Sequence, residues 1–214
     1  MTLVSLFKTN RLFFFGFLLF FLACVFVLLS YSKSDGFYLL NTYHSDFLTT
    51  LFIRFTYLGD GIFCVAAGVL LVVFKKRFLG LMVLSSYAIS GIIAQVLKSF
   101  ITEARPAVLL RDSSYQYFID DVTLHNLYSF PSGHASSAFA LAAVFSFAAE
   151  NKNYSVAFLS LAILVGYSRI YLAQHFIDDV LAGAMIGLFS AIISWIFFEK
   201  LFNHILRPKR KRTG

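Results

Sequence analysis

Residues 168–179, with the sequence SRIYLAQHFIDD, place an arginine, a histidine and two aspartates between two long apolar runs. His175 and Asp179 are four residues apart, so on a helix they would share one face. A carboxylate beside an imidazole fixes its tautomer and leaves the other ring nitrogen free to act as a base or a nucleophile. Ionisable groups at the edge of an apolar span are costly to place, so we expect this stretch to be functional.

The composition of the whole chain indicates a membrane protein. Of its 214 residues, 59% are hydrophobic and 27 are phenylalanine, and the mean hydropathy is +0.77. Only 14% are charged, whereas a soluble domain has about a quarter. We therefore expect an all-α polytopic membrane protein that forms one domain over residues 1–214. Cys24 and Cys64 both lie in apolar runs, which favours neither a disulfide nor a metal pair.

Six apolar segments are predicted to be transmembrane helices packed in one bundle. A span needs about 20 apolar residues, and the first segment, rich in phenylalanine, is expected to contact lipid. The last segment contains Gly183 and Gly187, a small-residue pattern that favours an internal helix contact over dimerisation. The predicted spans are 12–29, 57–74, 78–97, 132–149, 154–167 and 179–198.

The basic residues predict the orientation of the bundle. With six spans, the N-terminus, the basic turn 75–77, the turn with Lys152 and the basic tail 207–214 all fall on one side. The positive-inside rule assigns that side, with both termini, to the cytoplasm. The tail then lies near anionic lipid of the cell (inner) membrane, and we expect no nucleic-acid partner. The segments 33–56, 98–134 and 168–178 lie outside, on the periplasmic face.

Three polar clusters lie at the outer ends of the third, fourth and sixth predicted spans. They are Lys98-x6-Arg105-Pro106, then Pro131-Ser132-Gly133-His134, then Ser168-Arg169-x5-His175-x3-Asp179. Because each cluster adjoins a span end on the same side, helix packing is expected to bring them together at one depth. The motif core is therefore residues 98–179.

The chemistry of the three clusters is complementary and suits a phosphate. Lys98, Arg105 and Arg169 supply cations, and arginine matches phosphate oxygens with paired donors. Ser132 and Gly133, at a helix start, can offer backbone N–H groups to an anion.

Two histidines are available in the clusters as nucleophile and general acid. The residues alone do not decide which does what, although the carboxylate at i+4 favours His175 over His134 as the nucleophile. We find no clustered carboxylates or His/Cys set that would form a metal cage, so no metal or cofactor is expected.

The three clusters resemble the type 2 phosphatidic acid phosphatase (PAP2) superfamily, whose pattern is K-x6-RP, PSGH and SR-x5-H-x3-D. All eleven specified positions match in order, and the six-span layout is similar to the family's bacterial integral-membrane branch. The resemblance implies that His175 attacks phosphorus to form a phosphohistidine and that Asp179 orients it. It implies that His134 protonates the leaving oxygen and later activates water. The same resemblance implies that the phosphate is held by Lys98, Arg105, Ser132, Gly133 and Arg169.

Other polar residues have plainer expected roles. Glu103 is expected to pair with Arg105 or Lys98, and Asp178 to be a helix cap or a solvated residue. Asp60 is open between cap, loop residue and partner of the site. Three further histidines have no set of partners in the sequence and are expected to be structural: His44, His125 and His204.

The sequence therefore predicts a metal-independent membrane phosphatase of lipid phosphates. The candidate substrates are a polyprenyl diphosphate, lipid A phosphate, phosphatidic acid or phosphatidylglycerol phosphate, the first two favoured by the outward-facing site. The alternatives are a phosphotransferase with an acceptor other than water, and a non-catalytic lipid binder or transporter. A soluble vanadate-dependent haloperoxidase shares similar motifs, but the six spans argue against it. The sequence does not indicate an oligomeric state.

Overall fold

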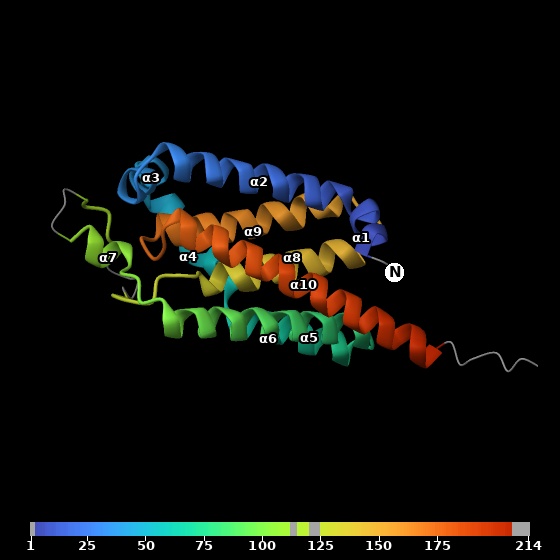
Figure 1. The fold of residues 1–214 in the computed structure, drawn as a ribbon. Helices are drawn as coiled ribbons and strands as arrows, with labels where there is room; N and C mark the ends of the chain where they lie inside the picture. Colours follow the sequence, from blue (N-terminus) through green and yellow to red (C-terminus); the bar gives the residue numbers. More distant parts are fainter. Residues whose placement is uncertain (1–2, 112–114, 120–124, 207–214) are drawn as a thin grey trace, which may run out of the picture.

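The computed structural model describes residues 3–111, 115–119 and 125–206, and all regular structure in these ranges is helical (Figure 1). The basic tail 207–214 lies outside the described residues. The helices are α1 (Leu3–Thr9), α2 (Arg11–Ser30), α3 (Lys33–Leu40), α4 (Asp46–Thr56), the 3-10 helix η1 (Tyr57–Gly59), α5 (Gly61–Val73), α6 (Arg77–Phe100), α7 (Pro106–Leu109), α8 (Gly133–Ala148), α9 (Tyr154–Tyr171) and α10 (Ile177–Leu206).

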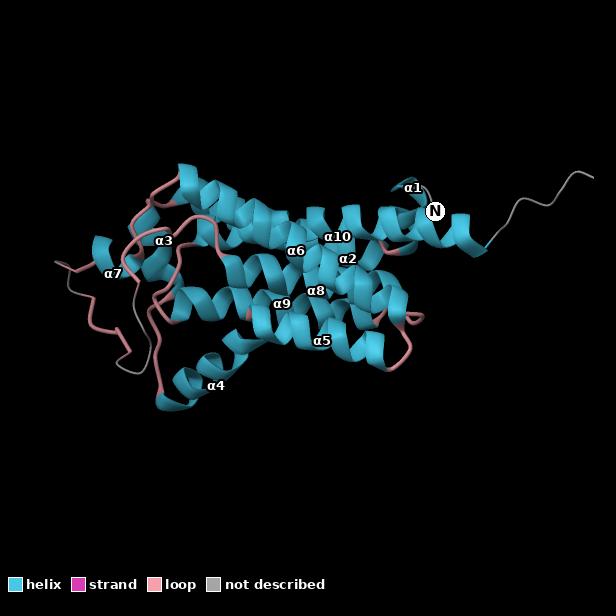
Figure 2. Ribbon diagram, turned by 90° about the horizontal axis from the view of Figure 1, so that it is seen from below, coloured by secondary structure: helices cyan, strands magenta, loops and turns pink. Residues whose placement is uncertain are grey.

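The long helices run side by side in a bundle whose two ends differ (Figures 1 and 2). One end carries α3, α7 and the loops 101–105, 125–132 and 172–176, and we call it the loop end. The opposite end carries α1 and the end of α10. The N-terminal helix α1 and the C-terminal end of α10 therefore lie at the same end of the bundle.

Four helices are long and apolar enough to cross a membrane: α2, α6, α9 and the part of α10 up to Phe202. A fifth candidate consists of Asp46–Gly59 and Gly61–Val73, which are bent by 54° relative to each other. The second predicted span, 57–74, is thus interrupted. The break lies at Asp60, whose side chain caps α5 by accepting a hydrogen bond from the Ile62 N–H at 2.7 Å.

Helix α8, predicted as the fourth span, has 16 residues and is shorter than the other candidate spans. Twelve of these residues are buried, and the helix contacts α10, α9, α6 and α5. Its alanines and serines allow this close packing, because small side chains let helix backbones approach. Gly183 and Gly187 of α10 lie directly against the α8 backbone, so the glycine pattern forms an internal contact.

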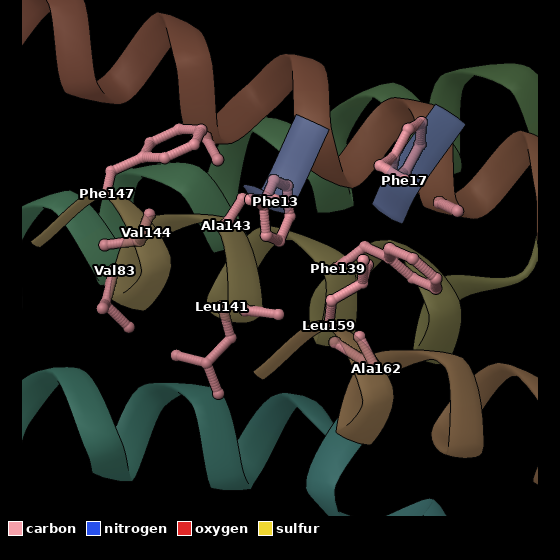
Figure 3. Close-up of a cluster of buried hydrophobic side chains, with 14 of the residues drawn as sticks. Phe13, Phe17, Val83, Phe139, Leu141, Ala143, Val144, Phe147, Leu159 and Ala162 are labelled. Carbon is pink, nitrogen blue, oxygen red and sulfur yellow. The ribbon is translucent and has the colours of Figure 1, made fainter. Parts of the chain in front are cut away.

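The apolar core forms around α8 (Figure 3). Phe13 and Phe17 of α2 pack edge to face on Phe147 and Phe139 of α8, with ring centroids 5.8 Å apart in both pairs. The expectation that the first span contacts lipid therefore fails for these two phenylalanines, although its other face is exposed, as at Phe15. Aromatic pairs of this geometry add to the stability gained from apolar burial.

Candidate active site

The site lies at the loop end, where two loop segments pair along their backbones. The Arg105 N–H donates to the Asn126 carbonyl at 2.9 Å, and the Ser129 N–H donates to the Glu103 carbonyl at 3.1 Å. The segment after α6 is thereby fixed to the segment before α8. This pairing places the first two clusters of the sequence next to each other.

His175 and Asp179 form a buried pair at the start of α10. Their side chains are 3% and 0% exposed, and Nδ1 of His175 lies 3.3 Å from Oδ2 of Asp179. The pair is not on one helix, as the spacing suggested, because α10 begins at Ile177 and His175 lies in the preceding loop. Asp179 is the third residue of the helix, and its Oδ2 accepts the Phe176 N–H at 2.8 Å. Such a bond fixes the loop on the helix start, much as a capping box does.

A third donor to Asp179 is Ser129, which the sequence analysis did not single out. Its hydroxyl donates to Oδ2 of Asp179 at 2.5 Å, and the residue is fully buried. Hydrogen bonds to an ionised acceptor are shorter and stronger than those between neutral groups. Ser129 therefore holds the carboxylate that contacts His175.

The three cations of the motifs lie close enough to His175 to act on it electrostatically. Burial lowers the pKa of His175 well below its usual value, and the charges of Arg169, Arg105 and Lys98 lower it further, against a backbone hydrogen bond at Ser129. Because its pKa is lowered, His175 is a neutral imidazole at neutral pH, and the neutral form can act as a nucleophile.

Each cation is held in place by a polar partner. Nζ of Lys98 donates to the Tyr128 carbonyl. Arg105 donates through Nε to the Leu127 carbonyl at 3.2 Å and through Nη1 to the Gln174 carbonyl at 3.3 Å. Both arginine contacts are to loop carbonyls that border the site, so the guanidinium is oriented before any anion binds.

Arg169 is the most buried of the three cations. Ser168 and Arg169 lie in the last turn of α9, which runs four residues beyond its predicted end, and not in the loop that opens α10. Nη1 of Arg169 donates to the Thr56 hydroxyl at 2.7 Å, while its Nε has no hydrogen-bond partner among the described residues. A buried donor without a partner is costly, and an anion would satisfy it.

The PSGH segment begins α8 and is bound to α10. The Ser132 side chain caps α8 by accepting the Ala135 N–H at 3.4 Å. We had expected the Ser132 N–H to be available to an anion. In the structure it is not, because it donates to the Asp179 carbonyl at 3.0 Å. Gly133 borders open space, since a Cβ added there would meet no atom within 4 Å.

His134 faces a cleft between the starts of α5 and α8 and the end of α6. Lys98 and Gly133 line this cleft together with Tyr87, Gln95 and several small residues, among them Gly59, Gly61 and Gly91. Asp60 lies near His134, with its Oδ2 3.9 Å from Nε2, and both side chains are about one third exposed. Asp60, whose role the sequence left open, is therefore both the cap of α5 and a neighbour of His134.

Two acidic residues have partners that the sequence did not predict. Glu103 pairs neither with Arg105 nor with Lys98, and Asp178 is not a solvated cap, because both bind Lys33 of α3. The expectation that no carboxylates cluster was also wrong, since Glu103, Asp178 and Asp179 each place one oxygen within 4.8 Å of the others. The ammonium of Lys33 lies beside this cluster.

The additional histidines differ in their surroundings. His44, for which the sequence showed no partners, contacts Asn41 through Nε2. Its ring stacks on Tyr117 and packs at a tilt against Tyr171, with centroid distances of 4.4 and 4.3 Å. His125 lines a groove that it shares with Lys98 and Arg105. The side chain of His204 lies outside the described residues.

Comparison with known proteins gives relatives that are named as phosphatases of lipid phosphates. Phosphatidylglycerophosphatase B of Bacillus subtilis is 32% identical over 140 residues, which is 60% of this chain and 62% of that protein. Lipid A 1-phosphatase of Rhizobium etli is 30% identical over 127 residues, or 58% of this chain and 52% of that protein. The matched segments thus span about half to three fifths of these curated relatives.

A solved structure shares the fold, and a family model matches the sequence. The crystal structure of Aquifex aeolicus LpxE superposes with a TM-score of 0.66 and 30% identity, covering 78% of this chain and 97% of that one. The family model described as the PAP2 superfamily matches residues 79–203, which is more than half of the chain and includes all of the PSGH segment and the His175–Asp179 segment. The chain therefore belongs to the PAP2 superfamily.

Proposed function

We propose that this protein is an integral-membrane phosphatase of lipid phosphates that works without a metal ion, through a phosphohistidine on His175. The observation that supports it most is the buried His175–Asp179 pair, with Nδ1 and Oδ2 3.3 Å apart, among the charges of Arg169, Arg105 and Lys98. A neutral histidine beside three fixed cations is suited to attack a phosphorus atom whose negative oxygens those cations bind.

The first step follows from this geometry. With Nδ1 held by Asp179, Nε2 of His175 carries the lone pair that forms the N–P bond, while the P–O bond to the lipid breaks. The unpartnered Nε of Arg169 is available to a phosphate oxygen. Phosphoryl transfer needs little beyond positioning and charge stabilisation, which the fixed cations provide. Burial and the charges of Arg169 and Arg105 lower the pKa of His134 to about 3, so His134 is neutral in the empty site. In this proposal the negative charge of the bound phosphate raises that pKa, and the protonated His134 then gives its proton to the leaving oxygen.

The second step regenerates the enzyme. His134, now neutral, removes a proton from a water molecule, and the oxygen of that water attacks phosphorus. The N–P bond breaks, which restores neutral His175 and protonated His134, and inorganic phosphate then leaves. The same residue thus serves as an acid in the first step and a base in the second, as microscopic reversibility requires.

The substrate would be a lipid whose phosphate reaches His134 through the cleft between α5 and α6 while its tail stays in the bilayer. The candidates are a polyprenyl diphosphate, lipid A phosphate, phosphatidic acid and phosphatidylglycerol phosphate. The loop end would face the periplasm and the termini the cytoplasm, with the protein in the inner membrane. The names of the relatives support this class of substrate, since they include a phosphatidylglycerophosphatase and a lipid A phosphatase.

The test is phosphate release by the purified protein in detergent with excess chelator, using the four lipids and His175→Ala as the inactive variant. We expect release from at least one lipid, loss of release in the variant, and inhibition by vanadate, which resembles five-coordinate phosphorus. Loss of activity that only added Mg²⁺ restores would contradict the metal-free mechanism. Activity that persists in His175→Ala would contradict the nucleophile.

The intermediate can be tested separately with a labelled aryl phosphate, whose leaving group needs no protonation. His134→Ala should then accumulate label on the protein, stable in alkali and labile in acid, because the step that activates water is blocked. Labelled product that forms only when an acceptor lipid is added would favour a phosphotransferase. Label that never appears in either protein would contradict the phosphohistidine.

A further inference from the structure

Among the described residues, Lys33 is the only lysine or arginine whose side chain pairs with Glu103 or Asp178 of the carboxylate cluster. It begins α3, near the loop end, and its Nζ lies 2.5 Å from Oε2 of Glu103 and 2.7 Å from Oδ2 of Asp178. The side chain is 32% exposed. Lys33 is outside residues 79–203, the part of the chain that the family model matches.

Two routes of direct contact lead from Lys33 to the His175–Asp179 pair. In the first, Lys33 binds the Glu103 side chain, the Glu103 carbonyl accepts the Ser129 N–H at 3.1 Å, and the Ser129 hydroxyl donates to Asp179 at 2.5 Å. In the second, Lys33 binds Asp178, the residue that precedes Asp179 in the chain. Both routes end at the carboxylate whose Oδ2 contacts Nδ1 of His175.

A third contact reaches the loop that carries His175. Nζ of Lys33 lies 4.9 Å from the ring centroid of Phe176, within the range of a cation–π interaction. The Phe176 N–H donates to Oδ2 of Asp179 at 2.8 Å. The ammonium therefore contacts Phe176, which donates to Asp179, and Asp178, which precedes Asp179 in the chain.

The ammonium of Lys33 balances the negative charge of the carboxylate cluster. Glu103, Asp178 and Asp179 gather oxygens within 4.8 Å of one another, and three carboxylates at such distances repel strongly. Burial lowers the pKa of Lys33, but its hydrogen bonds to Asp178 and Glu103 and the charges of Asp178 and Asp179 together outweigh burial, so the pKa is raised. An ammonium that stays protonated balances the carboxylates and keeps Asp179 available to accept from His175.

We propose that Lys33 is a positioning residue of the active site, so that α3, outside the matched family core, completes the geometry of His175 through Glu103 and Asp178. This rests on the proposed function, because the geometry that it supports is that of the nucleophile. Lys33 does not contact the substrate in this proposal. Its removal therefore slows the chemical step and leaves substrate binding nearly intact.

The test measures kcat and KM for Lys33→Met in the full-length protein, with a lipid that the wild type hydrolyses. We expect kcat to fall by about ten- to a hundredfold, the scale of a small displacement of a reacting group, with KM nearly unchanged. Lys33→Arg should recover most of the loss, since a guanidinium also binds two carboxylates. The exchange of charges in Lys33→Glu with Glu103→Lys should recover part of it.

Lys152→Met is a matched control, because Lys152 is also partly buried and its ammonium donates to the Ser146 and Phe147 carbonyls at the opposite end of α8. It should keep the wild-type kcat. Thermal unfolding of every variant in detergent separates misfolding from a change in the site. If Lys33→Met does not fold, Lys33→Arg and the exchanged pair carry the test.

Three results would overturn the proposal: a folded Lys33→Met with the wild-type kcat, a loss that appears in KM alone, or the same loss in Lys33→Arg and the exchanged pair as in Lys33→Met. Failure of the proposed function looks different. In that case His175→Ala would match the wild type, whatever the Lys33 variants do.

Discussion

The contact between α10 and the start of α8 gives a sharp prediction for Gly183→Ala. A Cβ on Gly183 would lie 2.5 Å from the Ser132 carbonyl oxygen and 2.9 Å from Cβ of Ala135, whereas ordinary contact begins at 3.4 Å. Because the obstacle is partly helix backbone, α8 and α10 must separate locally by about 0.9 Å. The PSGH segment would thereby move relative to the His175–Asp179 pair.

A displacement near 1 Å costs about a hundredfold in rate when it separates reacting groups, and overpacking costs about 1–3 kcal/mol of stability. We therefore expect Gly183→Ala to lose about two orders of magnitude in kcat/KM and to have a lowered Tm. The assay is phosphate release in detergent with thermal unfolding measured on the same preparation.

Two further glycine variants make the result decisive. In Gly187→Ala the added Cβ would meet the Ser136 carbonyl and the Ala140 nitrogen one turn farther from the site, so stability should fall similarly but activity less. Gly16→Ala meets only the end of the Leu159 side chain at 2.7 Å and should keep wild-type activity. Full activity and an unchanged Tm in Gly183→Ala would refute the reasoning, and so would equal losses of activity in Gly183→Ala and Gly187→Ala.

Three more predictions follow from the hydrogen bonds and charges of the site. Ser129→Ala removes the 2.5 Å hydrogen bond to Asp179, which as a bond to a charged group is worth about 1.5–3 kcal/mol, so both kcat and Tm should fall. Ser129→Thr keeps the hydroxyl and serves as the control. An unchanged kcat in the alanine variant would contradict this prediction. Because the pKa of His175 lies well below 6.5, the imidazole stays neutral as pH falls through 6.5, so kcat/KM should decline only in more acidic buffer, and a midpoint at or above 6.5 on the acid side would contradict it. Asp60→Asn and Asp60→Ala both lose the carboxylate 3.9 Å from His134, so both should have a lower kcat. Only Asp60→Ala should be less stable, by about 1 kcal/mol, because asparagine can still cap α5. Wild-type activity in Asp60→Asn would contradict a role for the contact with His134.

The convergence of the three motifs could be predicted because each lies beside the end of a predicted span. Arg105, Arg169 and Lys98 all act electrostatically on His175 in the structure. The contact between His175 and Asp179 was also expected from their spacing, but for a different structural reason. The pair is formed by a loop folded back on the first turn of α10, which a periodicity argument does not anticipate.

The partners of Lys33 had no local signal in the sequence. Lys33 is 70 and 145 residues from its partners, so only the tertiary fold brings the three together. The bend at Asp60 falls inside the predicted span 57–74, where the sequence left Asp60 open between a cap and a loop residue, and the structure shows that its side chain caps α5. The alanines and serines of α8, in contrast, indicate close helix packing from the sequence alone, and the helix is buried against its neighbours.

The burial of α8 has a consequence for how this enzyme would respond to its membrane. A helix enclosed by α10, α9, α6 and α5 has little surface that must match the thickness of the bilayer. The neighbouring helices should then set the depth of His134, and the lipid-exposed α2 should respond to a change in bilayer thickness by tilting. The rate of the chemical step should accordingly depend little on the acyl-chain length of the surrounding lipids. A change in membrane composition should affect access of the substrate more than it affects the chemical step.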